Sequence, residues 1–299
     1  MGATATGKTD LAVALAERFP VEIISVDSAL IYKDMDIGTA KPESSVLQKA
    51  PHFLLDIINP EQSYSVWDFI QDAKPLMDQI TSRGNIPLLV GGTMMYFNAL
   101  EFGINDLPIA DREIRKQLEK RAEVSGWPVL HEELAFFDPQ AASRIKPSDS
   151  QRIQRAIEVF KISGKTLTEL QSDETSKLDY DLTKIVLDIN DRSLLHQRIE
   201  MRFEQMLELG LIEELVDLKK IYQLNLTMTS MRCVGYRQVW QYLNGELSRA
   251  EMIDKAIIAT RQLAKRQITW LRRQTDYQSF DCLNYTKTDV FNWLSTVLF

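Results

Sequence analysis

The chain has 299 residues and a formal net charge of −7 at pH 7, with 26% charged residues. This length allows a full hydrophobic core and more than one structural unit. Its two cysteines, Cys233 and Cys282, exclude a disulfide framework and a cysteine-built zinc site. No apolar run approaches the roughly 20 residues that span a bilayer, and Lys8 and Asp10 interrupt any signal peptide. We therefore expect a cytoplasmic protein without a membrane partner.

The first hundred residues predict alternating helices and strands. Helices are expected over residues 8–18 and 65–83, and strands over 21–26, 52–57 and 86–90. This rhythm is typical of a parallel α/β sheet, which binds ligands beyond the carboxyl ends of its strands. The first residues of the chain, Asp27 and Gly92-Thr93 would meet at that edge.

A change of rhythm divides the rest of the chain. Helical periodicity dominates residues 108–179, so we expect a helical insertion domain there and a core domain made of residues 1–107 and 180–299. Within the insertion the predicted helices cover residues 111–125, 128–137 and 150–162. A strand follows at 182–189, and further helices are expected at 191–209, 211–222, 234–243 and 248–273.

The chain opens on a phosphate-binding loop. The pattern Gly, four residues, Gly-Lys-Thr is matched by Gly2, Ala3, Thr4, Ala5, Thr6, Gly7, Lys8 and Thr9. Such a loop gathers N–H groups and a lysine around a diphosphate and offers its last hydroxyl to Mg²⁺. A Gly-containing turn that matches by chance is the alternative. The buried strand that normally precedes the loop is missing, so we expect a natural chain about ten residues longer.

Four features at or near the predicted ligand edge have competing interpretations. Asp27 could be a general base or hold metal-bound water, or it could cap a helix. Asp56 is its rival, as the magnesium-organising residue of a kinase or nucleotide hydrolase. Gly91-Gly92-Thr93 could contact the diphosphate or form a simple turn. Arg202 could reach the same diphosphate or lie in solvent.

The segment from Arg232 to Arg273 is basic, with nine basic and three acidic residues and hence a charge of +6. Its cations could contact phosphates while Trp270 stacks on unpaired bases. The alternative is an amphipathic helix with Ile268 and Leu271 in the core, and both interpretations can hold for one helix. Gln151 and Arg155 share one helical face, where a solvated surface is the simpler interpretation.

Together these stretches resemble the bacterial tRNA dimethylallyltransferases (tRNA isopentenyltransferases) over nearly the whole chain. The matching stretches are residues 2–9, 24–32, 35–42, 51–56, 88–96, 151–156, 162–170, 232–237 and 265–272. The resemblance implies a P-loop NTPase-like α/β core with a parallel sheet and a helical insertion domain. It implies transfer of a dimethylallyl group from dimethylallyl diphosphate to N6 of the adenosine 3′ of the anticodon, in tRNAs that read codons beginning with U. The lack of a zinc-finger-like tail points to the bacterial form.

The resemblance also implies roles for individual residues. Asp27 would be the general base, while Lys8, Thr9 and Arg202 handle the diphosphate, with Mg²⁺ beside Thr9. Thr93 and Arg115 would contact substrate. The implied tRNA-binding residues are Asp27, Ser28, Ala29, Leu30, Thr93, Arg115, Gln151, Arg152, Ile153, Gln154, Arg155, Arg232, Cys233, Val234, Gly235, Tyr236, Arg237, Lys265, Arg266, Gln267, Ile268, Thr269, Trp270, Leu271 and Arg272. The expected partners are dimethylallyl diphosphate and the anticodon stem-loop of tRNA, bound by a monomer.

Three other functions remain open at this point. One is a P-loop kinase of a nucleotide or small metabolite, with ATP in the loop and Asp56 organising Mg²⁺. Another keeps the prenyl chemistry but takes free AMP or ADP as acceptor, against which the basic segment argues. The last is a catalytically inactive RNA-binding protein.

Overall fold

The computed structural model describes residues 1–172 and 180–298. The chain divides into two compact units. The first is made of Met1–Ala99 and Asp179–Phe299, and the second is Leu100–Leu178. The predicted division fell at residues 107/108 and 179/180. Residues 173–179, which belong to the predicted insertion, lie outside the described residues.

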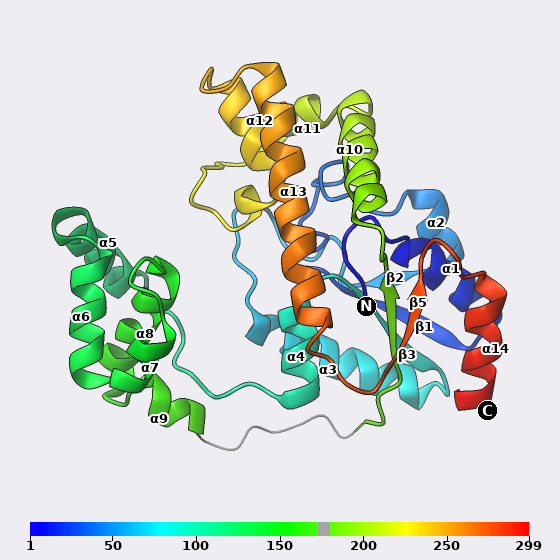
Figure 1. Cartoon of the computed structure of the whole chain (residues 1–299), viewed down its shortest axis with the longest axis horizontal. Helices are drawn as coiled ribbons and strands as arrows, with labels where there is room; N and C mark the ends of the chain where they lie inside the picture. The colour runs from blue at the N-terminus through cyan, green and yellow to red at the C-terminus, as the bar shows by residue number, and fades with distance from the viewer. Residues whose placement is uncertain (173–179, 299) are drawn as a thin grey trace. The chain divides into compact units, whose positions relative to one another are not determined.

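The first unit holds two small parallel sheets (Figure 1). In one of them β1 (Val21–Val26) lies between β2 (His52–Phe53) and β3 (Ile86–Gly91), with Val21 opposite Ile86 and Val26 opposite Gly91. The other pairs β4 (Lys184–Asp188) with β5 (Tyr277–Asp281). Because β1 and β3 run parallel and in register, their carboxyl ends meet at one edge, as predicted.

The start of the chain lies against β4. Gly2 forms a parallel bridge with Leu187, and the Leu187 N–H donates to the Met1 carbonyl at 2.9 Å. The amino group of Met1 donates to the carbonyl of Ile185 at 2.8 Å. The phosphate-binding loop therefore begins beside the carboxyl end of β4.

Helices of the first unit follow the predicted pattern closely. Helix α1 covers Lys8–Arg18 and α3 covers Val66–Ser82, whose first turn is closed by a reciprocal capping box between Ser65 and Asp68. The other helices before β5 are α2 (Ser44–Lys49), α4 (Met94–Phe102), α10 (Arg192–Glu208), α11 (Leu211–Ile221), the 3₁₀ helix Ser230–Arg232, α12 (Tyr236–Leu243) and α13 (Arg249–Leu271). Helix α14 (Lys287–Leu298) ends the unit.

Two of the apolar clusters that hold this unit together involve elements around the phosphate loop. The larger lies among α10, α11, α12 and α13 and the loop after β1, and it includes Tyr32, Phe203 and Tyr236. The smaller joins α1, β4 and α14 through Leu11, Leu187 and other residues. Burial of these side chains removes apolar surface from water and fixes the phosphate loop against both sheets.

The second unit is helical. Its helices are α5 (Arg112–Ser125), α6 (Trp127–Phe137), α7 (Pro139–Arg144), α8 (Ser150–Ser163) and α9 (Leu167–Ser172). Its own core contains Leu118, Leu130, Leu134 and Ile153, all fully buried. Phe137 and Phe160 stack with ring centroids 4.2 Å apart.

The structure corrects several predicted elements. The expected strand over residues 52–57 is only two residues long, because Leu54 and Asp56 have φ angles of 62° and 54° that end it. Short helices α2, α7 and α9, helix α4, and the final pair β5 and α14 were not predicted. No helix among the described residues has the length and apolar character that a bilayer crossing requires.

Candidate active site

The phosphate-binding loop adopts a backbone conformation that favours glycine at position 7. Gly7 adopts a φ of 82°, a left-handed conformation, directly before α1 begins at Lys8. The buried Thr6 hydroxyl donates to the Ala3 carbonyl at 2.9 Å, which closes the loop on itself. The first turn of α1 carries N–H groups without helical acceptors, and this is the usual site for an anion.

Two cations and one carboxylate interact at the mouth of this loop. Burial lowers the pKa of Lys8 to about 8; Asp27 opposes that shift and Arg202 adds to it. Burial likewise lowers the pKa of Arg202, again opposed by Asp27. The structure thus brings together Lys8 from α1, Asp27 from the end of β1 and Arg202 from α10. The Lys8 ammonium donates to the Ala3 carbonyl at 2.6 Å, a bond that a phosphate oxygen can replace.

Thr93 is fixed beside Asp27. Its N–H donates to the carbonyl of Val26 at 3.2 Å, and its hydroxyl oxygen accepts the N–H of Ser28 at 3.0 Å. Asp27 itself accepts the N–H of Ala29 at 2.9 Å, through one carboxylate oxygen. The turn after β3 is therefore joined to the turn after β1, and this contact brings Thr93 and Asp27 to the same edge of the sheet.

The groups around Asp27 stay protonated. Burial raises the pKa of the Cys233 thiol to about 12, and the charge of Asp27 adds to the shift. Burial also raises the pKa of Tyr96 above its usual range, with contributions from Tyr32 and Asp27. Tyr96 stacks on Phe69 with centroids 4.4 Å apart. Asp27 therefore lies near a thiol and a phenol whose raised pKa values keep both of them neutral at pH 7.

The donor set suits a magnesium ion that arrives with a diphosphate. Among residues 1–172 and 180–298, no group of three or more His, Cys, Asp or Glu side chains could hold a metal. Mg²⁺ commonly takes one or two protein ligands, several waters and substrate phosphate oxygens. The exposed Thr9 hydroxyl at the start of α1 matches this pattern.

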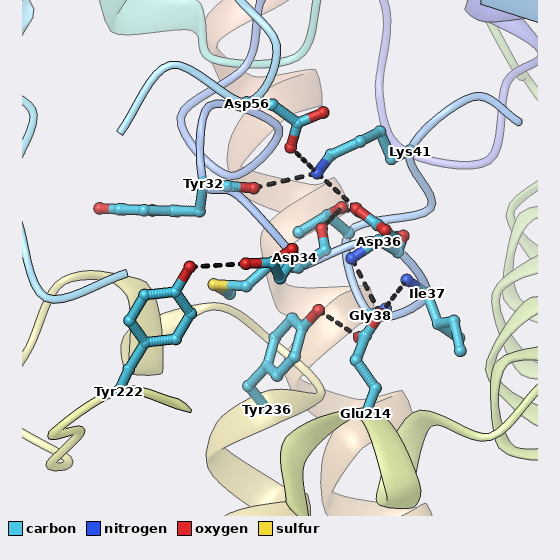
Figure 2. A network of polar contacts seen from close by, with 12 residues as sticks. Tyr32, Asp34, Asp36, Ile37, Gly38, Lys41, Asp56, Glu214, Tyr222 and Tyr236 are labelled. Atoms are coloured by element: carbon cyan, nitrogen blue, oxygen red, sulfur yellow. Dashed lines mark hydrogen bonds and ion pairs between the residues drawn. The ribbon is translucent and has the colours of Figure 1, made fainter. Parts of the chain in front are cut away.

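A network of polar contacts fixes the loop that follows β1, as Figure 2 shows. The carboxylate of Glu214 accepts N–H groups of Asp36, Ile37 and Gly38 at 2.7–3.1 Å, and the hydroxyl of Tyr236 at 2.5 Å. The loop belongs to residues 35–42, which the family resemblance singled out without giving them a role. Sequence reasoning did not identify Glu214, since nothing in α11 marks it.

Asp56 forms an ion pair with a buried lysine. The Lys41 ammonium, whose side chain is only 4% exposed, forms an ion pair with Asp56 and another with Asp36 at 2.5 Å (Figure 2). It also donates to the Tyr32 carbonyl at 3.0 Å. A carboxylate held by a buried lysine anchors the loop, and the interpretation of Asp56 as a magnesium-organising residue stays a prediction.

The residues expected to bind tRNA fall into three groups by exposure. The more exposed residues, which an RNA could contact, are Ser28, Gln151, Arg152, Arg232, Arg237, Lys265, Arg266, Thr269, Trp270 and Arg272. Partly exposed residues are Asp27, Ala29, Leu30, Thr93, Arg115, Gln154, Arg155, Cys233, Val234 and Ile268. The buried ones are Ile153, Gly235, Tyr236, Gln267 and Leu271. For this last group a role in tRNA binding stays a prediction, and it would have to act through the backbone or through neighbouring residues, because these residues are buried.

Arg115 and Arg155, in the second unit, share a protein partner. Glu158 is fully buried and accepts two hydrogen bonds from Arg115, at 2.8 and 3.1 Å, and one from Arg155 at 2.7 Å. Burial raises the pKa of Glu158, but the hydrogen bonds from both arginines outweigh it and leave the pKa below its usual value. The carboxylate therefore orients both guanidinium groups while leaving part of each exposed.

These features define a class of protein. A phosphate loop at the start of a helix, a carboxylate at the neighbouring strand end and exposed cations on α12 and α13 belong to a P-loop α/β protein. Such a site can bind a diphosphate compound and place a carboxylate next to the group that reacts with it. The model of the IPP transferase family matches residues 30–274, and the chain belongs to this family.

Individual relatives agree with this assignment. The tRNA dimethylallyltransferase of Dechloromonas aromatica (strain RCB) is 51% identical over 285 residues, which cover 95% of this chain and 91% of the relative. The tRNA isopentenylpyrophosphate transferase of Bacillus halodurans is 36% identical, with a TM-score of 0.72 over 99% of this chain and 94% of that one. A eukaryotic dimethylallyltransferase described as acting on tRNA is 26% identical, with a TM-score of 0.80 over 98% of this chain and 74% of its own.

Proposed function

We propose that this protein transfers a dimethylallyl group from dimethylallyl diphosphate to the N6 amine of an adenosine in tRNA. The observation that carries the proposal is the meeting of Asp27, Lys8 and Arg202 at the carboxyl end of β1. One carboxylate and two cations match the charges of this reaction, in which a proton leaves the acceptor and negative charge collects on the leaving group.

The leaving group would lie on the phosphate loop. As the bond between the allylic carbon and the diphosphate oxygen breaks, negative charge grows on that oxygen. Lys8, Arg202 and the N–H groups at the start of α1 stabilise this charge more strongly in the transition state than in the bound substrate. When bound, Mg²⁺ supplies further charge neutralisation beside Thr9.

The acceptor would approach from the side of Asp27. The exocyclic amine of adenine is a weak nucleophile, because its lone pair is delocalised into the ring. As N6 forms its bond to the allylic carbon, Asp27 accepts the N6 proton, so the amine nitrogen stays neutral. Thr93, fixed to the same turn, is placed to position the base or the prenyl group. The products are the N6-dimethylallyl adenosine and free diphosphate.

The RNA would lie on exposed cations. Arg232 precedes α12 and Arg237 lies in its first turn. Lys265 and Arg266 lie on α13, and Arg272 is the residue that follows its last turn. Cations at these positions neutralise phosphates, and the partly exposed ring of Trp270 offers a stacking surface for an unpaired base. The target base must leave its stack to reach Asp27, which costs a few kcal/mol that pocket contacts offset.

Finer features of the reaction belong to the same proposal. The target is the adenosine 3′ of the anticodon in tRNAs that read codons beginning with U, and the substrate pair is bound by a monomer. Because tRNA is the acceptor, the reaction takes place in the cytoplasm. Size-exclusion chromatography with light scattering tests the monomer, and sequencing of modified fragments tests the position.

Mass spectrometry of unmodified tRNA incubated with the protein, Mg²⁺ and dimethylallyl diphosphate tests the function. The expected product carries one added C₅H₈ unit on a single adenosine. AMP and ADP in excess serve as competing acceptors, and ATP alone, with ADP release as the readout, tests the kinase activity. Phosphoryl transfer without prenylation, or prenylation of AMP in preference to tRNA, would overturn the proposal.

A further inference from the structure

Gln267 connects the two turns that carry the proposed active site. Its side-chain oxygen accepts the N–H of Thr4 in the phosphate loop at 2.9 Å. Its side-chain nitrogen donates to the carbonyl of Gly92, in the turn after β3, at 2.9 Å. The side chain lies in α13 and is only 9% exposed. Both ends of one amide are thus used, one for each turn.

The contact to Gly92 is close as well as polar. A Cβ atom added to Gly92 would lie 2.5 Å from the Gln267 side-chain nitrogen and 3.5 Å from its amide carbon, and the nearest atom outside Gln267, the Gly2 carbonyl oxygen, would be 3.6 Å away. Glycine at position 92 is therefore what lets the glutamine reach across. The residue that follows is Thr93, which is bonded to the turn beside Asp27.

Gln267 differs from its neighbours on α13 in being buried. Lys265, Arg266 and Trp270 are exposed, whereas Gln267 faces inward with Ala264 and Leu271. The two turns that it joins would contact different reactants. The phosphate loop would hold the leaving diphosphate, and Thr93 lies beside Asp27, the proposed general base. A buried amide with both hydrogen bonds satisfied holds such turns at one separation.

We propose that Gln267 is a positioning residue that sets the distance between the diphosphate on the phosphate loop and the acceptor base beside Asp27 and Thr93. The inference rests on the proposed function. A displacement of about 1 Å between reacting groups can reduce a rate on the order of a hundredfold. Loss of Gln267 should therefore act on turnover and on the diphosphate substrate, and leave the affinity for tRNA unchanged.

The first test replaces the amide by an apolar side chain of similar length. In Gln267→Met we expect kcat to fall about 10- to 100-fold and KM for dimethylallyl diphosphate to rise several-fold, with the Kd for tRNA within about twofold of wild type. Gln262→Met, the same exchange at an exposed position of α13, should leave all three unchanged. Arg266→Ala should do the reverse of Gln267→Met, weakening tRNA binding with little effect on KM for dimethylallyl diphosphate. Rates are measured on protein shown to be folded by circular dichroism.

A second test uses the close approach at Gly92. Gly92→Ala alone should slow turnover, because its methyl group pushes the glutamine aside. In a Gln267→Ala background the obstacle is gone, so the added methyl should change the rate by less than about twofold. Penalties that simply multiply in the double variant would contradict the proposal, and so would a weakened tRNA Kd with unchanged kcat in Gln267→Met.

Binding of inorganic diphosphate by calorimetry separates this inference from the proposed function. Gln267→Met should weaken diphosphate binding whether or not wild-type protein prenylates tRNA. Equal diphosphate affinity in the variant and the wild type would overturn the inference alone. An inactive wild type whose diphosphate binding still depends on Gln267 would overturn the proposed function and leave the inference standing.

Discussion

The hydroxyl of Tyr236 donates a 2.5 Å hydrogen bond to the carboxylate of Glu214, which also accepts three N–H groups of the loop after β1 (Figure 2). One carboxylate thereby joins α11, α12 and the segment that leads away from Asp27. The basic residues Arg232 and Arg237 flank this anchored tyrosine. This contact therefore connects the element that carries the proposed RNA surface to the loop that follows the proposed general base.

Removal of that hydroxyl should destabilise the first unit. We expect Tyr236→Phe to reduce the free energy of unfolding by about 2 kcal/mol, because the donor is buried and its acceptor is a carboxylate. Urea denaturation followed by circular dichroism measures the change. The matched control is Tyr222→Phe, whose hydroxyl bonds Asp34 in a more exposed position and should cost less than about 1 kcal/mol. Equal losses would show that the Glu214 contact has no special role.

Replacement of the proposed base should separate chemistry from binding. In Asp27→Asn the carboxylate that accepts the N6 proton is gone, so we expect kcat to fall about 10²- to 10⁴-fold. The Kd for tRNA, measured by filter binding, should change little, since the exposed cations are untouched. Glu17→Gln, at an exposed position of α1, serves as the control and should keep wild-type turnover. Near-normal kcat in Asp27→Asn would remove Asp27 from the role of base.

The low pKa of Lys8 predicts a pH limit on substrate binding. Its pKa is lowered to about 8 in the ligand-free protein, so the ammonium is charged below that pH and becomes neutral above it. We expect kcat/KM for dimethylallyl diphosphate to decline above about pH 8, approaching tenfold per pH unit, because the neutral amine no longer attracts the diphosphate.

The variant Lys8→Arg isolates this titration. A guanidinium stays charged at all accessible pH values, so calorimetric binding of inorganic diphosphate by the variant should lose the decline near pH 8, whatever its absolute affinity. The same decline in both proteins would assign the titration to another group.

Loss of the buried carboxylate in the second unit should weaken its helices. Glu158→Gln leaves Arg115 and Arg155 without a counter-charge, and we expect a loss of about 2 kcal/mol, below the full penalty of a buried pair because both arginines are partly exposed. Hydrogen exchange of α5 and α8 and thermal denaturation measure it. The exposed pair Arg121–Glu133 gives the control: Glu133→Gln should cost less than about 1 kcal/mol.

The same carboxylate predicts a pH dependence of stability. Its pKa in the folded protein lies below the ordinary value of 4.5, so its contribution is present above that value and is lost as the pH falls through the folded pKa. The difference in stability between wild type and Glu158→Gln should therefore shrink below about pH 4.5. A difference that stays constant down to pH 3 would contradict this account.

Local patterns predicted elements whose ends are set by local chemistry. Helix α1 and strand β1 have the predicted limits, because Gly7 and Pro20 bound the helix and a β-branched run forms the strand. The predicted length of strand β2 was wrong, since the positive φ angles of Leu54 and Asp56 depend on contacts with the loop after β1. Strand β5 was missed because Tyr277–Asp281 has weak strand character and is held by its parallel partner β4.

The sequence by itself determined the phosphate loop, the aspartate at the strand end and the basic segment, because spacing along the chain carries their chemistry. Only the tertiary structure decided which of these residues face a ligand. A residue's neighbours in space, and hence its burial and hydrogen bonds, come from segments far away along the chain. Gln267 and Tyr236 therefore lie inside the protein within stretches that the sequence assigned to RNA, and Asp56 meets a buried lysine where the sequence allowed a metal.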